Sequence, residues 1–334
     1  MNDAQHYAPY RVNVLTREQL RHLNNLTPSI AVRDTLVNWA IIIMGWSAVA
    51  LKPTWWMVFL AVVLVGTRYY ALSIIGHDGL HRRLFKSRYI NDLWADLTIF
   101  GPVCAITRVN RINHIEHHWV TCLPNDPDRH KYVHDHKETT VWFLFFLSGL
   151  QSLRPSFRNI FLKNRGNTPA AGDADTRETP GERYRPHDLL IIVGWQFVLI
   201  VGLSQTIGWW AYPVLWLLPI YMFAYRADLV RVFCEHSMLV PDAEADRRQR
   251  LITYTSNAFE RQFFAPYNMN FHAAHHLWPS IPYYNLAEAD RLIRNWVDGH
   301  GRSESFIWRR SYVGYIVSYW LWQLRKPNLA PVAS

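Results

Sequence analysis

Apolar residues in this chain gather into four long runs, and most charged residues lie between them. A helix needs roughly 20 apolar residues to cross a hydrocarbon core of about 30 Å. The pattern therefore predicts four membrane-spanning helices, arranged as two hairpins with short turns. The predicted spans are residues 35–51, 54–76, 188–205 and 208–226.

Three further apolar segments are too short or too interrupted to cross a membrane. They comprise residues 93–106, 140–150 and 312–324, and each is predicted to be a helix that lies at the membrane interface. Residues 164–186 are rich in Gly, Pro and charged residues and are predicted to be a flexible loop.

The distribution of Lys and Arg predicts the orientation of the spans. The turns within the two hairpins contain only Lys52, whereas the regions outside the hairpins carry nearly all the other basic residues. By the positive-inside rule, those regions and both termini are cytoplasmic. The expected organisation is an N-terminal cytoplasmic segment (1–34), a membrane domain (35–286) and cytoplasmic or interfacial C-terminal helices (287–334).

Composition narrows the function classes. The net charge of +9 is not concentrated on a recognisable nucleic-acid-binding module, so no nucleic-acid partner is expected. The 16 Trp and 17 Tyr suit belts at the membrane interface. The three cysteines are widely spaced, without a CxxC pair, which argues against a disulfide framework or a zinc finger.

Histidines recur in short clusters with helical spacing. They are His77 and His81; then His114, His117 and His118; and finally His272, His275 and His276. Residues three or four positions apart share one face of a helix, and imidazole is a common metal ligand. His236, just after the last span, is a natural ninth member. Each cluster follows a membrane end, where ionisable residues are functional by default.

Nine imidazoles exceed what one zinc ion takes, because structural zinc has four ligands and catalytic zinc usually three. Two metal ions with four or five nitrogens each would use them all and leave positions for dioxygen. Iron suits imidazole, whereas magnesium and calcium prefer oxygen ligands. The sequence thus predicts two iron ions held by histidine alone.

Four polar residues inside or beside the clusters are candidates to support these ligands. They are Asp78, Glu116, Glu235 and Asn270. The carboxylates could accept the second N–H of an imidazole, or form ordinary surface ion pairs. Asn270 is either a support of this kind or a helix cap. His130, His134 and His136 form a separate cluster, expected to be solvated loop residues.

The order of these motifs resembles that of the integral-membrane fatty acid desaturase family. The chain reads HDxxH from His77, HxxHH from His114, Glu-His at 235–236, and NxHxxHHLxPxxPxxxL from Asn270. The resemblance covers about 38–286. It departs mildly at Phe271, where tyrosine is common. It implies an all-α integral membrane protein, with a four-helix stem and a cytoplasmic helical cap that encloses a di-iron site ligated by the nine histidines.

The resemblance also implies an activity: O2-dependent insertion of a C=C bond into a fatty acyl lipid linked to CoA, a carrier protein or a phospholipid. Hydroxylases, acetylenases and carotenoid-type oxygenases share the motifs and stay as alternatives. The sequence has neither a His-Pro-Gly-Gly haem signature nor a four-cysteine cluster pattern. Electrons are therefore expected from a separate donor of the ferredoxin or cytochrome b5 type.

Two other classes fit less well. A membrane zinc metallohydrolase would carry HExxH, whereas Asp78 follows the first histidine here and two further clusters would go unexplained. A metal transporter or sensor would line a path with polar residues, and the predicted spans contain few: Asn38, Arg68 and Gln196.

Overall fold

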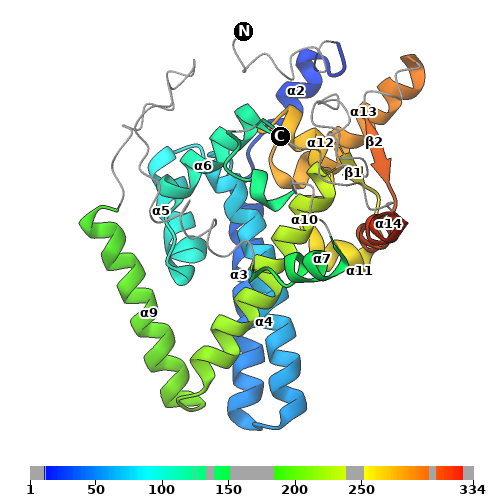
Figure 1. Cartoon of the computed structure of the whole chain (residues 1–334). Helices are drawn as coiled ribbons and strands as arrows, with labels where there is room; N and C mark the ends of the chain where they lie inside the picture. Colours follow the sequence, from blue (N-terminus) through cyan, green and yellow to red (C-terminus); the bar gives the residue numbers. More distant parts are fainter. Residues whose placement is uncertain are drawn as a thin grey trace.

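The computed structural model describes residue 11 and residues 13–123, 125–132, 139–150, 184–237, 252–300 and 306–325. These residues are mostly helical, and they form a stem of long helices below a cap of shorter ones (Figure 1). Residues 164–183 of the predicted flexible loop lie outside the described residues.

Four helical stretches are long and apolar enough to cross a membrane, which confirms the predicted number. They are α3 (Pro28–Leu51), α4 (Trp55–Leu80), α9 (Pro186–Thr206) and the stretch Pro213–His236, which contains η6 (Pro213–Leu217), η7 (Ile220–Tyr225) and α10 (Arg226–His236). The first begins at Pro28 rather than at residue 35. Proline suits the first position of a helix, where no N–H donor is needed, and polar residues in the next turns hide this start from a hydropathy pattern.

Close backbone approach holds the stem together. Gly45 of α3 lies 3.8–3.9 Å from Ala61 and Leu64 of α4, measured from an ideal Cβ position. At Gly66 of α4, such a Cβ would lie only 2.3 Å from the ring of Phe223 in η7. The absence of a side chain at Gly66 therefore lets these two spans pack against each other.

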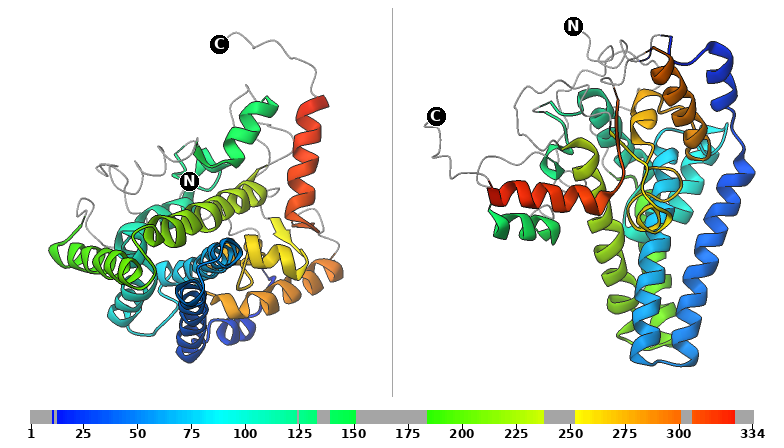
Figure 2. Two further views of the ribbon diagram at one scale, coloured as in Figure 1. Left: turned by 90° about the horizontal axis from the view of Figure 1, so that it is seen from below. Right: turned by 90° about the vertical axis from the view of Figure 1, so that its right-hand side faces the viewer.

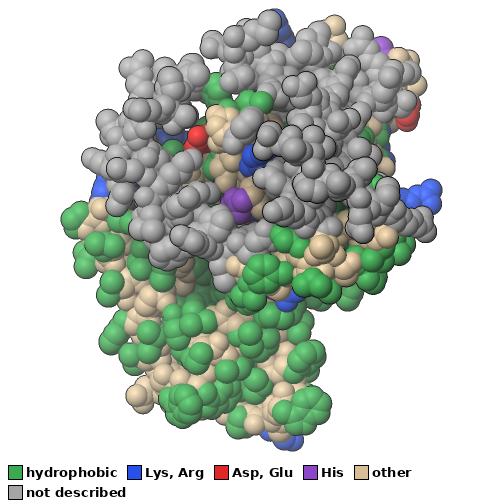
Figure 3. Space-filling model, in the orientation of Figure 1, with side chains coloured by type: hydrophobic (Ala, Val, Ile, Leu, Met, Phe, Trp, Pro, Cys, Tyr) green, Lys and Arg blue, Asp and Glu red, His purple; other side chains and the backbone are tan. Residues whose placement is uncertain are grey.

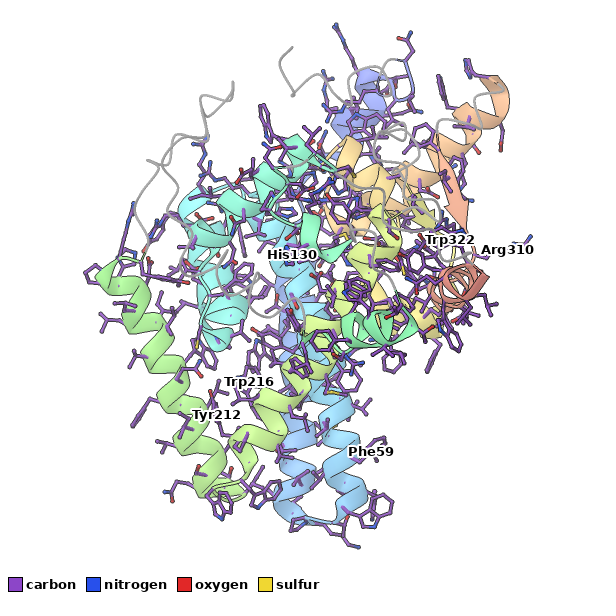
Figure 4. The ribbon with its side chains drawn as sticks, in the orientation of Figure 1. Phe59, His130, Tyr212, Trp216, Arg310 and Trp322 are labelled. Atoms are coloured by element: carbon purple, nitrogen blue, oxygen red, sulfur yellow. The ribbon has the colours of Figure 1, made fainter. Side chains whose placement is uncertain are left out.

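Several tryptophans lie inside the stem. The ring of Trp39 is 5.5 Å from that of Trp195 and 6.1 Å from that of Trp216, and both pairs are stacked. Figure 4 places Trp216 in the stem, well below His130 in the cap. The expected interfacial role therefore does not apply to these three indoles. Trp55 and Trp209, at the far end of the stem, are over 80% exposed and do suit an interface (82% and 84%).

The cap brings segments from the whole chain together. Its elements are α2 (Arg17–Leu23), α5 (Arg88–Ala95), η2 (Asp96–Phe100), η3 (Gly101–Val103), α6 (Thr107–Val120), η4 (Arg129–Lys131), α12 (His272–Leu277), η9 (Tyr283–Asn285) and α13 (Leu286–His300). A parallel pair of three-residue strands, β1 (Ile252–Tyr254) and β2 (Ile307–Arg309), joins its late part, with Ile252 opposite Ile307. The sequence did not predict these strands, because such short segments pair across a long separation.

Three helices lie across the direction of the spans where the cap meets the stem: α7 (Thr140–Leu147), α11 (Ala258–Phe264) and α14 (Tyr312–Arg325) (Figures 1 and 2). On α14, Tyr312, Tyr315 and Tyr319 are buried, whereas apolar residues of the opposite face are exposed. Figure 3 shows hydrophobic side chains over the stem up to this level. The arrangement agrees with helices that lie at a membrane surface, and that placement stays a prediction.

Candidate metal centre

The histidine clusters sit on helix ends that converge in the cap. His77 is in the last turn of α4 and His81 follows it as the C-terminal cap residue. The second cluster lies along α6, the third forms α12, and His236 is the last residue of α10. Four segments far apart in sequence thus supply the imidazoles.

The nine histidines form two neighbouring groups. In the first, the imidazoles of His77, His81, His114, His118 and His275 each offer a nitrogen, and these nitrogens lie within 4.8 Å of one another. In the second group, nitrogens of His117, His236 and His276 likewise lie within 4.8 Å of one another. We include His272 in this group because its Nε2 atom lies 2.9 Å from Nε2 of His236. All nine candidates are therefore brought together.

The geometry fits metal ions. In the first group, Nε2 of His114 lies 2.7 Å from Nε2 of His81 and 3.1 Å from that of His118. Nitrogens about 2.0–2.1 Å from one ion come roughly this close to each other. Nε2 of His275 also lies 3.1 Å from Nε2 of His118. Neutral imidazole nitrogens that converge in this way present several lone pairs to one point, and a metal ion there can accept them together.

The imidazoles are also in the protonation state that metals need. Burial lowers the pKa of His81 to about 3. Burial and the neighbouring imidazoles lower the pKa of His114, His118 and His275 well below its usual value. Neutral imidazole presents a lone pair, so these groups can bind a metal at neutral pH without first losing a proton.

His117 differs because a carboxylate holds it. Its Nδ1 atom lies 2.9 and 3.1 Å from the two oxygens of buried Asp126. Burial alone would lower the pKa of His117, but the charge and hydrogen bond of Asp126 outweigh it and raise the pKa. Asp126 also accepts hydrogen bonds from the Tyr132 hydroxyl and the backbone amides of Cys122 and Asp128. Sequence reasoning did not assign this role to Asp126, although its position in a polar turn soon after the second cluster was a signal.

Glu235 lies beside His272, without a hydrogen bond between the two side chains. One carboxylate oxygen lies 3.2 Å from Nδ1 of His272 and accepts a hydrogen bond from Arg231 at 2.8 Å. The other accepts one from the hydroxyl of Tyr312 at 2.9 Å. The structure thus places Glu235 next to a candidate ligand. That Glu235 orients this ligand stays a prediction.

The other candidates have different surroundings. Asp78 accepts a hydrogen bond from the backbone amide of Tyr283 at 2.7 Å, and Asn270 donates one to the carbonyl of Tyr254, also at 2.7 Å. Glu116 lies half-buried on α6 between histidines of the second cluster. His130 is half-buried in the cap (Figure 4), whereas His134 and His136 lie outside the described residues.

A cavity of about 290 Å³ adjoins the histidines. His114 and His276 line it from the two groups, and Phe100, Leu229 and Val232 provide apolar wall. The polar part of the lining includes Asn110, Lys131 and Asp228. The space can hold a flexible chain segment beside the imidazoles.

These features define a mostly helical protein with four membrane-length helices and a site of nine clustered histidines. The model of the family described as "Fatty acid desaturase" matches residues 53–308, and the chain belongs to this family. The protein is therefore an oxidoreductase of the desaturase type.

Individual relatives are distant. An sn-1 oleoyl-lipid 12-desaturase of Arthrospira platensis is 21% identical over 79% of this chain and 78% of its own length. A dihydrorhizobitoxine desaturase of Bradyrhizobium elkanii is 23% identical over 85% and 81%, respectively. An sn-1 acyl-lipid omega-3 desaturase (ferredoxin) of Nostoc is 23% identical over 77% and 71%.

Proposed function

We propose that this protein is a membrane-bound, O2-dependent desaturase that inserts a C=C bond into the acyl chain of a lipid. The observation that carries the proposal is the convergence of nine imidazoles from four segments into two adjacent groups. Relatives named as acyl-lipid desaturases support the same substrate class.

In this proposal, each histidine group holds one iron ion. His77, His81, His114, His118 and His275 bind the first, and His117, His236, His272 and His276 bind the second. Iron bound in this way supplies reaction with dioxygen and removal of hydrogen from an unactivated carbon.

The chain's own residues position the reactants. The apolar wall formed by Phe100, Leu229 and Val232 holds methylene groups of the substrate beside the histidines and keeps water away from them. Asp126 holds the ring of His117 in place through its second N–H group. Glu235 lies 3.2 Å from Nδ1 of His272 and would orient that ring by its charge. Substrate choice then depends on which C–H bond this wall presents.

An electron donor is part of the proposal. Desaturation removes two hydrogens and two electrons, whereas reduction of O2 to two waters takes four electrons. A separate protein must provide the other two electrons, and the printed name of the Nostoc relative points to ferredoxin for that enzyme. We infer a donor of the ferredoxin or cytochrome b5 type here.

We infer further that the cap and both termini face the cytoplasm. The turn between α3 and α4 holds Lys52 alone among basic residues, which suits the positive-inside rule. A reporter fused to the C-terminus and active only in the cytoplasm tests this orientation, because a terminus on the opposite side of the membrane would leave it inactive.

The test of function is a lipid profile by mass spectrometry of a desaturase-deficient host that expresses this chain with a ferredoxin. We expect a new double bond that disappears in His118→Ala. It should persist in the control variant His22→Ala, because the His22 side chain is 72% exposed on α2.

Other results would redirect the proposal. New hydroxylated lipids would assign the chain to the hydroxylases. Purified protein that holds zinc instead of iron, together with an unchanged lipid profile, would refute the desaturase proposal and favour a zinc metallohydrolase.

A further inference from the structure

A short segment between α5 and α6 forms part of the cavity wall beside the histidines. It runs from Asp96 to Val103 and consists of the π-helical turn η2 followed by the 3₁₀ turn η3. The backbone amide of Gly101 closes η2 by bonding to the carbonyl of Asp96, five residues earlier. Turns of this kind are rare and occur frequently at functional sites. Phe100, the last residue of η2, lines the cavity.

All four membrane-length helices hold this segment in place. Each provides a side chain that donates a hydrogen bond to a backbone carbonyl of the segment. These bonds run from Trp39 of α3 to Thr98, from Tyr69 of α4 to Ile99, from Trp195 of α9 to Leu97 and from Trp216 of η6 to Pro102. The indole bonds measure 2.7 Å for Trp39, 2.8 Å for Trp195 and 3.3 Å for Trp216. The whole stem therefore positions this part of the cavity wall.

Phe100 also packs closely against α4. An ideal Cβ at Gly76 would lie 3.1 Å from Cζ of the Phe100 ring and 2.8 Å from Cγ2 of Ile99. These distances are shorter than an ordinary van der Waals contact, so the approach needs a residue without a side chain at position 76. Gly76 directly precedes His77, a member of the first histidine group. The ring of Phe100 is thus held next to the candidate metal centre.

The cavity extends from the histidines into the stem. Along the last span its lining reaches from His236 back to Tyr225, and these 11 positions (236 minus 225) correspond to about 16 Å of helix. Along α4 it reaches Ser73, about one turn before His77. The part of the cavity that lies in the stem is therefore bounded by Ser73, Phe100 and Tyr225, whereas residues of η4 line it in the cap.

We propose that Phe100 limits how far the methyl end of the substrate chain extends past the histidines, and so determines which C–H bond is presented to them. This role rests on the proposed desaturase function. The methyl end lies in the stem part of the cavity and stops at the Phe100 ring. Of the other two residues there, Ser73 is small, and the hydroxyl of Tyr225 is engaged with the carbonyl of Gly149 at 3.2 Å. The number of carbons between the new double bond and the methyl end then has a maximum, which the fixed ring sets.

The first test supplies saturated fatty acids of graded chain length to a desaturase-deficient host that expresses the full chain with a ferredoxin. Mass spectrometry gives, for each product, the number of carbons between the double bond and the methyl end. Phe100→Ala removes the phenyl ring, so the maximum should rise by roughly two to four carbons, since the surroundings collapse into part of the space. Phe100→Trp adds volume and should lower the maximum. If Phe100→Ala does not fold, Phe100→Leu should give a smaller rise.

The control variant is Phe59→Ala, because Phe59 is 61% exposed on α4 and lies far down the stem from the cap (Figure 4). Its products should match those of the wild type.

A second measurement does not need turnover. A fatty acid with a diazirine at its methyl end is fed to the same host, which attaches it to its own carriers, and the isolated membranes are irradiated. Mass spectrometry of the purified chain then maps the labelled residues. We expect labels within residues 96–103 and on Leu229, which lines the cavity and is only 1% exposed, so that a chain end reaches it through the cavity alone. Phe100→Trp should reduce this labelling.

Two results would overturn the proposal. One is an equal maximum in wild type, Phe100→Ala and Phe100→Trp, which would mean that another feature places the chain. The other is labelling confined to lipid-facing residues such as Phe59, which would mean that no methyl end enters the cavity. Labels within residues 96–103 without any new double bond would support Phe100 as the end of the binding cavity and refute the desaturase reaction instead, so the two failures differ.

Discussion

Replacing Asp126 with asparagine tests whether the second histidine group depends on this buried carboxylate. Asp126 accepts from His117, from the amides of Cys122 and Asp128, and from the Tyr132 hydroxyl. An asparagine side chain has one acceptor oxygen where the carboxylate has two. Its NH2 group must therefore face at least one of these donors, and the negative charge beside His117 is lost.

The expected loss of metal affinity is moderate, because Asp126 contacts only His117 among the four histidines of the second group. Loss of a partner that orients a metal ligand typically weakens metal binding about 10–100-fold. This corresponds to about 1.4–2.7 kcal/mol, because a tenfold change is about 1.4 kcal/mol. The loss should fall on the second group alone, since Asp126 contacts His117 and the first group has its own five histidines.

The assay is the iron content per chain after equilibration with increasing concentrations of a chelator, measured by plasma mass spectrometry. Wild type should hold two irons over a range in which Asp126→Asn has fallen to one. Asp290→Asn is the matched control, because Asp290 is a buried carboxylate that bonds to Arg294 and Trp308 in the cap, away from the histidines. Equal iron retention by the two variants would refute the role of Asp126, and loss of both irons at once would refute two separable sites.

Further predictions concern pH, packing and the C-terminal helix. Iron should leave the second group first as the pH falls, because the raised pKa of His117 lets protons compete with the metal there at a higher pH than in the first group; equal release from both groups would contradict this. Gly66→Ala puts a methyl group 2.3 Å from a ring carbon of η7 and should destabilise the protein by about 1–3 kcal/mol. In a thermal unfolding assay, the control Gly202→Ala, with open space around it, should not lower the melting temperature. Tyr312→Phe removes the hydrogen bond to Glu235 and should weaken iron binding about tenfold with little change in apo-protein unfolding, whereas a matching loss of apo stability would indicate a packing role only.

The sequence predicted the histidines of the site better than their partners. Spacings of three and four residues place imidazoles on one helix face whatever the fold, so each cluster is visible in the sequence alone. The bond between Asp126 and His117 depends instead on the turn after α6, where Cys122 has a φ of 71° and the chain folds back. The spacing of residues along the sequence does not predict this reversal of the chain.

The same limit explains the differences in the stem. Apolar runs predicted four spans, but a hydropathy pattern does not distinguish an α-helix from one with π-helical turns. The last span contains two such segments, η6 and η7, and the second carries Phe223 against Gly66. Similarly, the stacking of Trp39 with Trp216 depends on how the helices are placed side by side, and it moves these rings away from the expected interface.

Asp78 positions the histidines indirectly, by a hydrogen bond that holds the backbone of a neighbouring segment. Its carboxylate holds the backbone amide of Tyr283, and the hydroxyl of the same tyrosine donates to Asp34 on α3, with both bonds at 2.7 Å. Tyr283 follows the third histidine cluster, so these two bonds fasten the segment after α12 to both α3 and α4. Because Asp78 is the residue next to His77, the same contact sets the distance between the first and third clusters. The joining of His77 and His275 in one group therefore depends on a carboxylate that holds a backbone amide.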